Sequence, residues 1–266
     1  MKRLIPIFLV ARTASTRLPG KILAQIHGKT VLEHLLDRLK LAKRPDGLIL
    51  CTTSLAADDH LVKIATSRGL ECYRGDPEDV PMRLLGAARE VGAEFLIFAE
   101  GDEVFMDPDY VDQLVECYRE TKADYVKITG LPIGSWVSGV KVGALARVCE
   151  MKPEGATDTW GRFLTEAGIF KTVTLPPNPP LSPFDPELRM TLDYPEDLDL
   201  VRAVFDHLYV PGRILRLKDV VLLLQRLPEL VDINRHLNEV YQQRCEAQHE
   251  AQFKRKSDEG TGRIPS

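Results

Sequence analysis

The sequence lacks the marks of a membrane, disulfide-rich or zinc-binding protein. No apolar run approaches the roughly 20 residues that a membrane span needs. The run after Met1-Lys2-Arg3 is only about eight residues long, too short for a signal peptide. The five cysteines are scattered without a Cys-x-x-Cys pair, which is typical of reduced thiols. We therefore expect a cytoplasmic protein without membrane insertion.

Several common catalytic motifs are also missing. The sequence has no Gly-x-Ser-x-Gly, His-Glu-x-x-His or Gly-x-Gly-x-x-Gly, so it does not support a hydrolase elbow, a zinc protease or a dinucleotide-binding fingerprint. The net charge of −4 over 266 residues gives no general attraction to nucleic acid. Any anion must therefore be bound by a local group of cations.

The order of the apolar segments predicts an α/β fold. Strands are expected at 5–10, 47–53, 70–73, 94–99, 124–128, 135–142, 169–175 and 188–192. Helices are expected at 30–44, 58–69, 79–92, 109–122, 144–151, 158–167, 196–209 and 218–225. Strict alternation in the first half implies a mixed, mainly parallel sheet with helices on both faces. Six prolines between positions 176 and 186 form a stiff arm, either a surface loop, a lid or a subunit contact.

Such a sheet binds ligands beyond the carboxyl ends of its strands, where residues 11–21 follow the first strand. This loop carries three cations, Arg12, Arg17 and Lys21. Arginine can fork onto phosphate oxygens, and lysine acts as a point charge. Gly20 permits a close backbone approach, and the small residues Ala14, Ser15 and Thr16 leave their amides open to a ligand. The loop therefore suits a polyphosphate, although a plain basic surface loop remains the alternative.

The loop is not a P-loop, because Ser15 occupies the place of the first glycine and Ile22 follows the lysine. Two aspartates stand where predicted strands end, Asp102 and Asp193. If both strands join the sheet of the loop, the two carboxylates meet beside it and can hold Mg²⁺ together with substrate oxygens. Each aspartate taken alone could instead belong to a turn or a helix cap.

The sequence resembles a known family. The run Ala11-Arg12-x-x-Ser15-Thr16-Arg17-Leu18-Pro19-Gly20-Lys21 is similar to the signature of the cytidylyltransferases that activate acidic sugars. These are CMP-Kdo synthetase, acylneuraminate cytidylyltransferase and, most closely, the spore-coat polysaccharide type. The similarity continues at Arg83, Gly101-Asp102, 192–198 and 227–234, and is weaker from about 130 to 187.

The resemblance implies the nucleotide-diphospho-sugar transferase fold and transfer of CMP from CTP to an acceptor. It implies a nucleotide site made by Ala11, Arg12, Ser15, Thr16, Arg17, Gly20, Lys21, Arg83 and Gly101. Lys21, Arg17 and Asp102 would be catalytic, and Asp102 and Asp193 would hold the Mg²⁺ cofactor. The acceptor would be a sugar acid or another small anion, in surface-polysaccharide synthesis.

The resemblance also implies a single domain over residues 1–243 and a homodimer. Residues 1–130 would form the nucleotide-binding half, 131–190 the acceptor and dimerisation part, and 191–243 the second metal loop and the last helices. Residues 244–266 are polar, and we expect a disordered tail. Two positions depart from the family pattern and bear on the shape of the loop after the predicted strand 94–99. Val104 replaces the usual proline, and Glu100 precedes the glycine.

Two alternatives stay open at this stage. The enzyme could prefer UTP or GTP, because base choice depends on a few loop contacts that sequence does not place. Alternatively, the chain could be a nucleotide-binding protein of the same fold that has lost turnover. The presence of Lys21, Asp102 and Asp193 argues against that loss.

Overall fold

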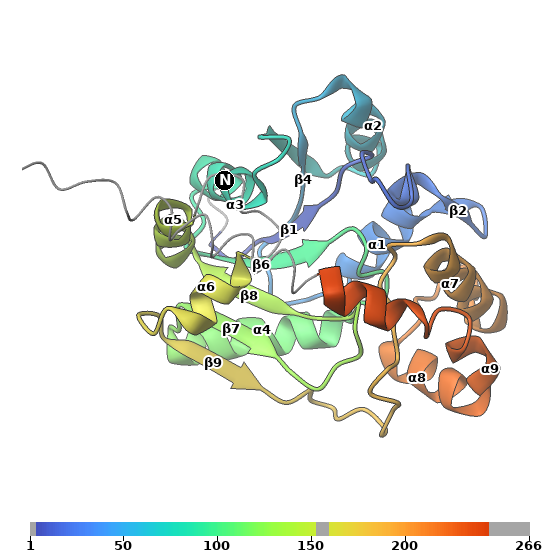
Figure 1. Ribbon diagram of the computed structural model, residues 1–266. Coiled ribbons are helices and arrows are strands. Elements are labelled where there is room, and N and C mark those ends of the chain that lie inside the picture. The colour runs from blue at the N-terminus through green and yellow to red at the C-terminus, as the bar shows by residue number, and fades with distance from the viewer. Residues whose placement is uncertain (1–3, 153–159, 245–266) are drawn as a thin grey trace, which may run out of the picture.

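The computed structural model describes residues 4–152 and 160–244, and a seven-stranded sheet forms their centre (Figure 1). Its strands are β1 (Ile7–Val10), β4 (Leu48–Thr53), β5 (Glu71–Gly75), β6 (Phe95–Glu100), β7 (Tyr125–Ile128), β8 (Ser138–Lys141) and β9 (Thr172–Leu175). They lie in the order β5-β4-β1-β6-β8-β7-β9. All neighbours are parallel except β8, which runs antiparallel to both β6 and β7. The expected mixed, mainly parallel sheet is confirmed.

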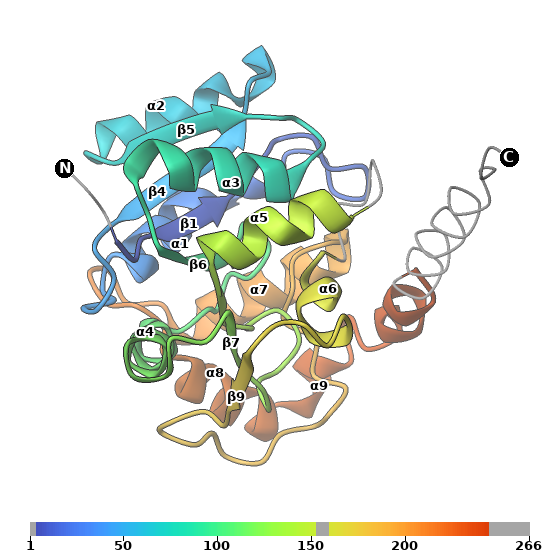
Figure 2. The same cartoon turned by 90° about the vertical axis from the view of Figure 1, so that its left-hand side faces the viewer.

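Helices cover both faces of this sheet (Figure 2). They are α1 (Val31–Leu39), α2 (Asp59–Ser67), α3 (Val80–Val91), α4 (Pro108–Thr121), α5 (Val142–Met151), α6 (Gly161–Glu166), α7 (Pro195–Leu208), α8 (Leu217–Arg226) and α9 (Pro228–Val231). Short segments complete the first half: the 3₁₀ turns η1 (Lys21–Leu23) and η2 (Ala56–Asp58) and the hairpin of β2 (Gln25–Ile26) with β3 (Lys29–Thr30). None of the helices in the described ranges is long and apolar enough to cross a membrane.

The core has two sides because neighbouring side chains of a strand point to opposite faces. Ile7 and Leu9 of β1 pack in the cluster that includes α1, α2, α4, α7 and α8. Phe8, between them, packs in the cluster of α3, α5 and α6. These buried, near-continuous apolar strands are what a parallel sheet requires when helices cover both faces.

The strand order places a ligand-binding edge between β1 and β6. The chain continues from β1 to β4 on one side, and β6 lies on the other, so the two carboxyl ends form a topological switch point. The backbone amide of Gly101 donates to Val10 O at 2.9 Å. A Cβ at Gly101 would lie 3.0 Å from Ile22 Cδ1 and 3.2 Å from Val10 O, so glycine lets the two strand ends approach closely.

Two predicted elements differ in the structure. The predicted strand 188–192 is wrong, since this segment joins the sheet nowhere and forms only an isolated bridge between Arg189 and Ile133. The helix expected to run to residue 44 begins at the Thr30 cap as predicted but ends at Leu39. Beyond it, Asp112 Oδ1 accepts from the amides of Lys43 and Arg44, each at 2.8 Å. These tertiary hydrogen bonds replace the helical ones.

Three further expectations have partial answers. The proline arm packs along α4, where Tyr110 Oη donates to Pro179 O at 2.9 Å and Gln113 Nε2 donates to Pro176 O at 2.9 Å. The helix expected at 158–167 is described only as α6, because 153–159 lie outside the described residues. Of the tail expected over 244–266, Arg244 belongs to the helical residues 237–244, and 245–266 lie outside the described residues.

Candidate active site

The loop after β1 is fixed by the buried carboxylate of Asp58, in the 3₁₀ turn η2. Asp58 Oδ1 accepts from Thr13 N at 2.7 Å and from Thr13 Oγ1 at 2.6 Å, and its other oxygen accepts from Thr53 at the end of β4. The loop closes on itself where Gly20, at φ 69°, donates its amide to Thr13 O at 3.2 Å. Gly20 thus serves a left-handed turn and does not line the cavity that the loop borders.

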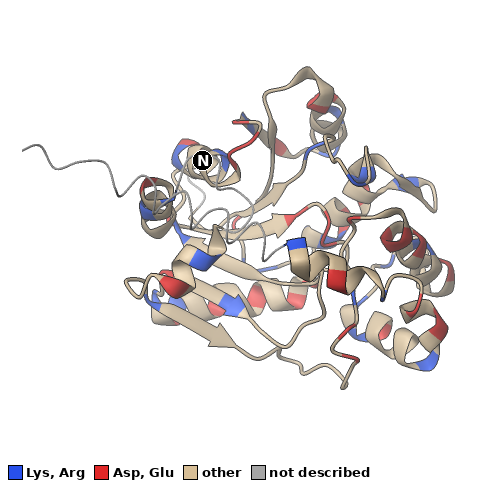
Figure 3. Ribbon diagram, viewed as in Figure 1, with Lys and Arg blue, Asp and Glu red and all other residues tan. Residues whose placement is uncertain are grey.

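That cavity, of about 340 Å³, collects nearly every site residue predicted from sequence. Ala11, Arg12, Ser15, Thr16, Arg17, Lys21, Arg83, Gly101, Asp102 and Asp193 all line it. The prediction did not include the other walls, among them Glu100, Glu103, Trp136, Trp160, Thr191, Tyr241 and Arg244. Figure 3 shows acidic and basic residues interspersed over the described elements, so the concentration of charge in this cavity is a local feature.

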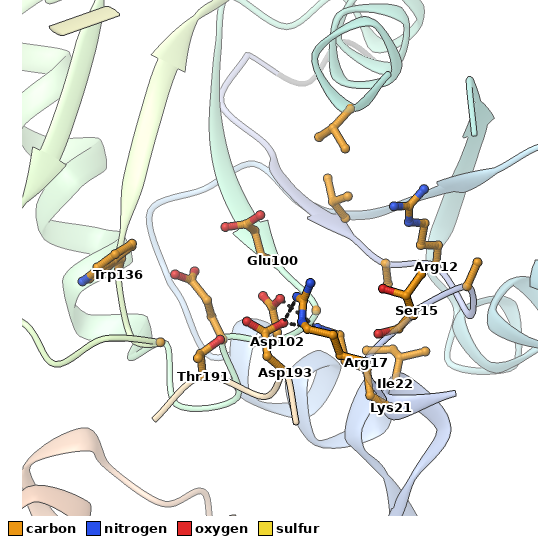
Figure 4. A pocket seen from close by; sticks show the side chains of 18 of the residues that line it. Arg12, Ser15, Arg17, Lys21, Ile22, Glu100, Asp102, Trp136, Thr191 and Asp193 are labelled. Carbon is orange, nitrogen blue, oxygen red and sulfur yellow. Dashed lines mark hydrogen bonds and ion pairs between the residues drawn. The ribbon is translucent and has the colours of Figure 1, made fainter. Parts of the chain in front are cut away.

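Two cations and two carboxylates meet at the centre of the cavity (Figure 4). Lys21 Nζ donates to Asp102 Oδ2 at 2.9 Å and to Asp193 Oδ1 at 3.1 Å. Arg17 Nη2 donates to the same Asp193 oxygen at 2.6 Å. Lys21 therefore bridges two aspartates that lie 91 positions apart in the sequence.

Asp193 lies near Asp102 for a structural reason that differs from the predicted one. The amide of Leu192 donates to the carbonyl of Asp102 at 3.0 Å, so the extended segment 188–192 lies directly on the loop after β6. The loop 131–137 supports this segment from the other side, where Met190 N donates to Ile133 O at 2.7 Å. A Cβ at Gly134 would lie 2.0 Å from Thr191 N, which leaves room only for glycine.

A buried polar network holds the loop that carries Asp193 in place. Asp197, on the first turn of α7, accepts from the amides of Asp193 at 2.8 Å and Tyr194 at 2.9 Å. Its carboxylate also receives a bidentate pair from Arg189 at 2.9 and 3.0 Å and a bond from Asn234 Nδ2 at 2.8 Å. All three side chains of this network are buried. This arrangement explains why the similarity in sequence extends to segments 192–198 and 227–234, which contact each other around Arg189.

The charges of the site stabilise one another. Burial disfavours the charged form of Asp193, but the Coulombic attraction of Lys21 and the hydrogen bond from Arg17 outweigh it and lower its pKa to about 2. Burial likewise works against charge on Lys21, and the attraction of Asp102 and Asp193 nevertheless raises its pKa. Asp193 and Lys21 are therefore both charged at neutral pH.

This linkage makes stability depend on pH. An aspartate in the unfolded chain has a pKa of about 3.9, above the folded value of Asp193, so its contribution is complete above about pH 4 and is lost as pH falls toward 2. In metal-free buffer we expect a loss on the order of 2 kcal/mol over that window. Urea unfolding of the wild type and Asp193→Asn at pH 6, 4 and 2.5 measures it. The difference in unfolding free energy between the two proteins should shrink as pH falls, and a constant difference would contradict the linkage.

Arg12 and Arg83 occupy a second part of the cavity. Arg12 Nη1 donates to Pro77 O at 2.9 Å and pairs with Glu78 Oε2 at 3.2 Å. Arg83, almost fully buried, donates from Nε to Asp76 O at 3.0 Å and from Nη2 to Pro77 O at 3.3 Å. Both arginines thus hold the turn before α3, and Arg12 lies apart from the pair of carboxylates (Figure 4).

Asp102 and Asp193 fit a hard divalent cation. They provide two carboxylates that converge on one cationic atom, Lys21 Nζ, at 2.9 and 3.1 Å. Within the described residues no group of three or more His, Cys, Asp or Glu side chains could hold a metal. Two carboxylates are nevertheless the usual protein contribution to a Mg²⁺ ion that completes its shell with water and substrate phosphates.

A second, larger cavity of about 690 Å³ adjoins the first. Glu100, Glu103, Trp136, Trp160 and Tyr241 line both. The remaining wall comes from β7, β8 and α6 and includes Lys127 and Arg162. Glu103 is buried, and burial together with the neighbouring Glu100 and Asp102 charges raises the pKa of its carboxyl. Val104, in place of the proline of the family pattern, is packed in the core.

The sequence of this chain is similar to those of known proteins. Residues 7–156 match the model of the family described as cytidylyltransferase. The spore coat polysaccharide biosynthesis protein SpsF of Bacillus subtilis is 26% identical over 209 residues, which cover 75% of this chain and 85% of that protein. A 3-deoxy-manno-octulosonate cytidylyltransferase of Geobacter sulfurreducens is 31% identical over 121 residues, 45% of this chain and 47% of that protein. The chain thus spans about half the length of the second relative.

Two solved structures share the fold. A cytidylyltransferase from Leptospira borgpetersenii has a TM-score of 0.77 and 22% identity, and the match covers 85% of this chain and 96% of that one. A CMP:2-keto-3-deoxy-manno-octonic acid synthetase, complexed with CTP, has a TM-score of 0.59 and 19% identity, over 77% and 99%. The nucleotide-diphospho-sugar transferase fold expected from sequence is confirmed by these neighbours.

Proposed function

The chain belongs to the cytidylyltransferase family, a family of nucleotidyltransferases, and we propose that it transfers CMP from CTP to a small acidic acceptor with Mg²⁺ bound at Asp102 and Asp193. The observation that carries the proposal is the convergence of these two carboxylates on Lys21, within a cavity bordered by the cationic loop after β1. This is the arrangement that nucleotidyl transfer needs, because the reaction depends on positioning and on neutralising phosphate charge.

The loop cations are proposed to bind the triphosphate of CTP. Arg17 and Lys21 pair with the carboxylates. If the carboxylates held Mg²⁺, both cations would be available to phosphate oxygens. Ala14, Ser15 and Thr16 line the same space. Arg12 and Arg83 would lie nearer the nucleoside, as they hold the turn before α3.

The proposed reaction forms one bond and breaks one. The acceptor oxygen attacks the α-phosphorus of CTP, and the bond from that phosphorus to the bridging oxygen breaks, so pyrophosphate leaves with the electron pair. If the acceptor is a hydroxyl, its proton passes to water, and bound Mg²⁺ would lower the pKa of that hydroxyl. If the acceptor is a phosphate or phosphonate, the attacking oxygen is already ionised.

The second cavity is proposed to hold the acceptor. It shares Glu103 and Trp136 with the first cavity and is large enough for a sugar acid. The names of the relatives, which refer to spore coat polysaccharide and to 3-deoxy-manno-octulosonate, favour an acidic sugar for surface polysaccharide. We further propose a homodimer in which residues 131–190 contribute to the contact, and a cytoplasmic location. The free thiols Cys51, Cys72, Cys117 and Cys149 agree with such a reducing compartment.

Thermal stabilisation by nucleotides tests the proposal directly. We expect CTP with Mg²⁺ to raise the melting temperature selectively over UTP, GTP and ATP, and to do so less without Mg²⁺, because ligands that bind only the folded state stabilise it. At a concentration 100 times the dissociation constant the gain is about 2.7 kcal/mol. A larger shift with UTP or GTP would change the base assignment. No shift with any nucleotide would favour a protein of this fold without turnover.

A further inference from the structure

The last helical residues that the structure describes bring two side chains into the site that were not predicted. Tyr241 and Arg244 lie in the helical residues 237–244, and both line the cavity of Asp102 and Asp193. Tyr241 lines the second cavity as well. The end of the described chain therefore forms part of the wall at the junction of the two cavities.

Arg244 is held in place and keeps donors unused. Its guanidinium lies 5.1 Å from the centroid of the Tyr241 ring, and the buried Arg189 lies 4.9 Å from the same centroid. Its Nη2 approaches Asp193 Oδ2 only to 3.6 Å, too far for a good hydrogen bond. Its Nε and Nη1 are buried and have no hydrogen-bond partner among the described residues. A positioned arginine with unsatisfied donors is a ready site for an anion.

Arg244 lies on the acceptor side of Asp193. One carboxylate oxygen of Asp193, Oδ1, receives Arg17 and Lys21 from the phosphate loop. The other, Oδ2, lies 3.6 Å from Nη2 of Arg244 and 3.6 Å from Nη2 of the buried Arg189. Arg17 and Lys21 thus approach one oxygen of Asp193, and Arg244 approaches the other. Tyr241, next to Arg244, also lines the second cavity.

The chemistry of acidic acceptors places their acid group at this position. In a cyclic 2-ulosonic acid, the reacting hydroxyl and the carboxylate are attached to the same carbon. In a phosphate or phosphonate acceptor, the reacting oxygen belongs to the acid group itself. The acid group must therefore lie beside the carboxylates that would hold Mg²⁺, next to Arg244. Lys127 and Arg162, in the wall of the second cavity, would face the rest of the acceptor.

We propose that Arg244 binds the acidic group of the acceptor, with Tyr241 as its support. This proposal rests on the proposed cytidylyltransferase function. Arginine can fork onto a carboxylate or a phosphate, so the shared ligand chemistry is an oxyanion directly adjacent to, or including, the attacking oxygen.

Intrinsic fluorescence offers a direct test, because the two tryptophans of the chain, Trp136 and Trp160, both line both cavities. The full chain is saturated with Mg²⁺ and a CTP analogue that carries a methylene group between the α- and β-phosphorus. It is then titrated with 3-deoxy-manno-octulosonate and N-acetylneuraminate as carboxylates and with methyl phosphate as a phosphate. The arm that saturates at the lowest concentration identifies the class of acid group.

Arg244→Ala should raise the dissociation constant of the acidic probe about tenfold to a hundredfold, as expected for loss of a charge-assisted pair. Binding of the CTP analogue should change less than twofold. Arg244→Lys should fall between the wild type and the alanine variant, because lysine keeps the charge but not the fork. Arg235→Ala is the matched control. Arg235 belongs to the same C-terminal part but pairs with Asp185, Glu187 and Asp232 and lines neither cavity.

Three results would overturn the assignment of Arg244. They are an absence of probe binding to the wild type, an equal loss in Arg244→Ala and Arg235→Ala, and an equal loss of probe and nucleotide in Arg244→Ala. The nucleotide arm separates this inference from the proposed function. If the CTP analogue fails to bind with Mg²⁺, the proposed function itself is wrong. If it binds normally while Arg244→Ala leaves the probe unaffected, only the inference is wrong.

Discussion

Asp102→Asn is expected to reduce Mg²⁺-dependent release of pyrophosphate by at least about a thousandfold, equivalent to roughly 4 kcal/mol of transition-state stabilisation. The amide keeps the shape of the side chain but removes the charge that would bind Mg²⁺ and pair with Lys21. The fold should survive, because the Asp102 side chain is 26% exposed and the carbonyl that holds Leu192 belongs to the backbone. Pyrophosphate release and the melting temperature, measured on the same preparation, check both parts.

The control for Asp102→Asn is Asp206→Asn. Asp206 is an exposed carboxylate that pairs with His27 and lies outside both cavities. Its loss should leave pyrophosphate release within twofold of the wild type. Full activity of Asp102→Asn would refute the metal assignment. A lower affinity for Mg²⁺ with turnover restored at high Mg²⁺ would mean that Asp193 and the nucleotide hold the metal without Asp102.

The positions of the loop after β1 and of Asp102 could be predicted from sequence because they follow from the order of strands and helices along the chain. A strand followed by a short loop and a helix places the loop at the carboxyl edge of a parallel sheet. The same reasoning places Asp102 after β6. What sequence could not supply was the neighbour relation of β1 and β6, which brings Gly101 to 2.9 Å from Val10 O.

Asp193 lines the cavity beside the loop after β1, where its carboxylate was expected from sequence, but the structure contradicts the reason for that expectation. The prediction required a strand at 188–192 that joins the sheet, whereas the segment is anchored by Leu192 to the loop of Asp102 and by Asp197 to α7. Its apolar side chains are buried between elements, as those of a strand would be. Hydrophobic pattern alone does not distinguish the two cases.

The part of the cavity wall that includes Trp136, Trp160 and Arg244 could not be predicted, because these residues come from segments with weak local signals. Trp136 lies in the loop before β8, Trp160 lies just before α6, and Arg244 lies in a polar stretch that reads as the beginning of a tail. Each becomes part of the site only through contacts between segments far apart in the sequence. Gly134 carries one signal, since glycine in an otherwise apolar run often marks a close backbone approach.

Replacing Lys21 is expected to have a different effect from replacing an ordinary phosphate-binding lysine. Its ammonium pairs with Asp102 and Asp193, the same carboxylates that would hold Mg²⁺. Lys21→Met keeps the aliphatic bulk and leaves the two carboxylates without this cation. Breaking one partner of such a largely buried pair costs about 3 kcal/mol, so the melting temperature in EDTA should fall by about 5–10 °C.

Mg²⁺ should then stabilise Lys21→Met more than it stabilises the wild type, because in the variant it no longer competes with the ammonium for the carboxylates. Turnover should nevertheless fall by about a hundredfold or more, since the lysine charge is also needed on the triphosphate. Melting curves with EDTA and with Mg²⁺, together with pyrophosphate release, measure the two effects. Lys63→Met, at an exposed position of α2, controls for the loss of a lysine. An equal or smaller Mg²⁺ shift in Lys21→Met would mean that the metal and the lysine do not share these carboxylates, and the metal would then have to be placed elsewhere.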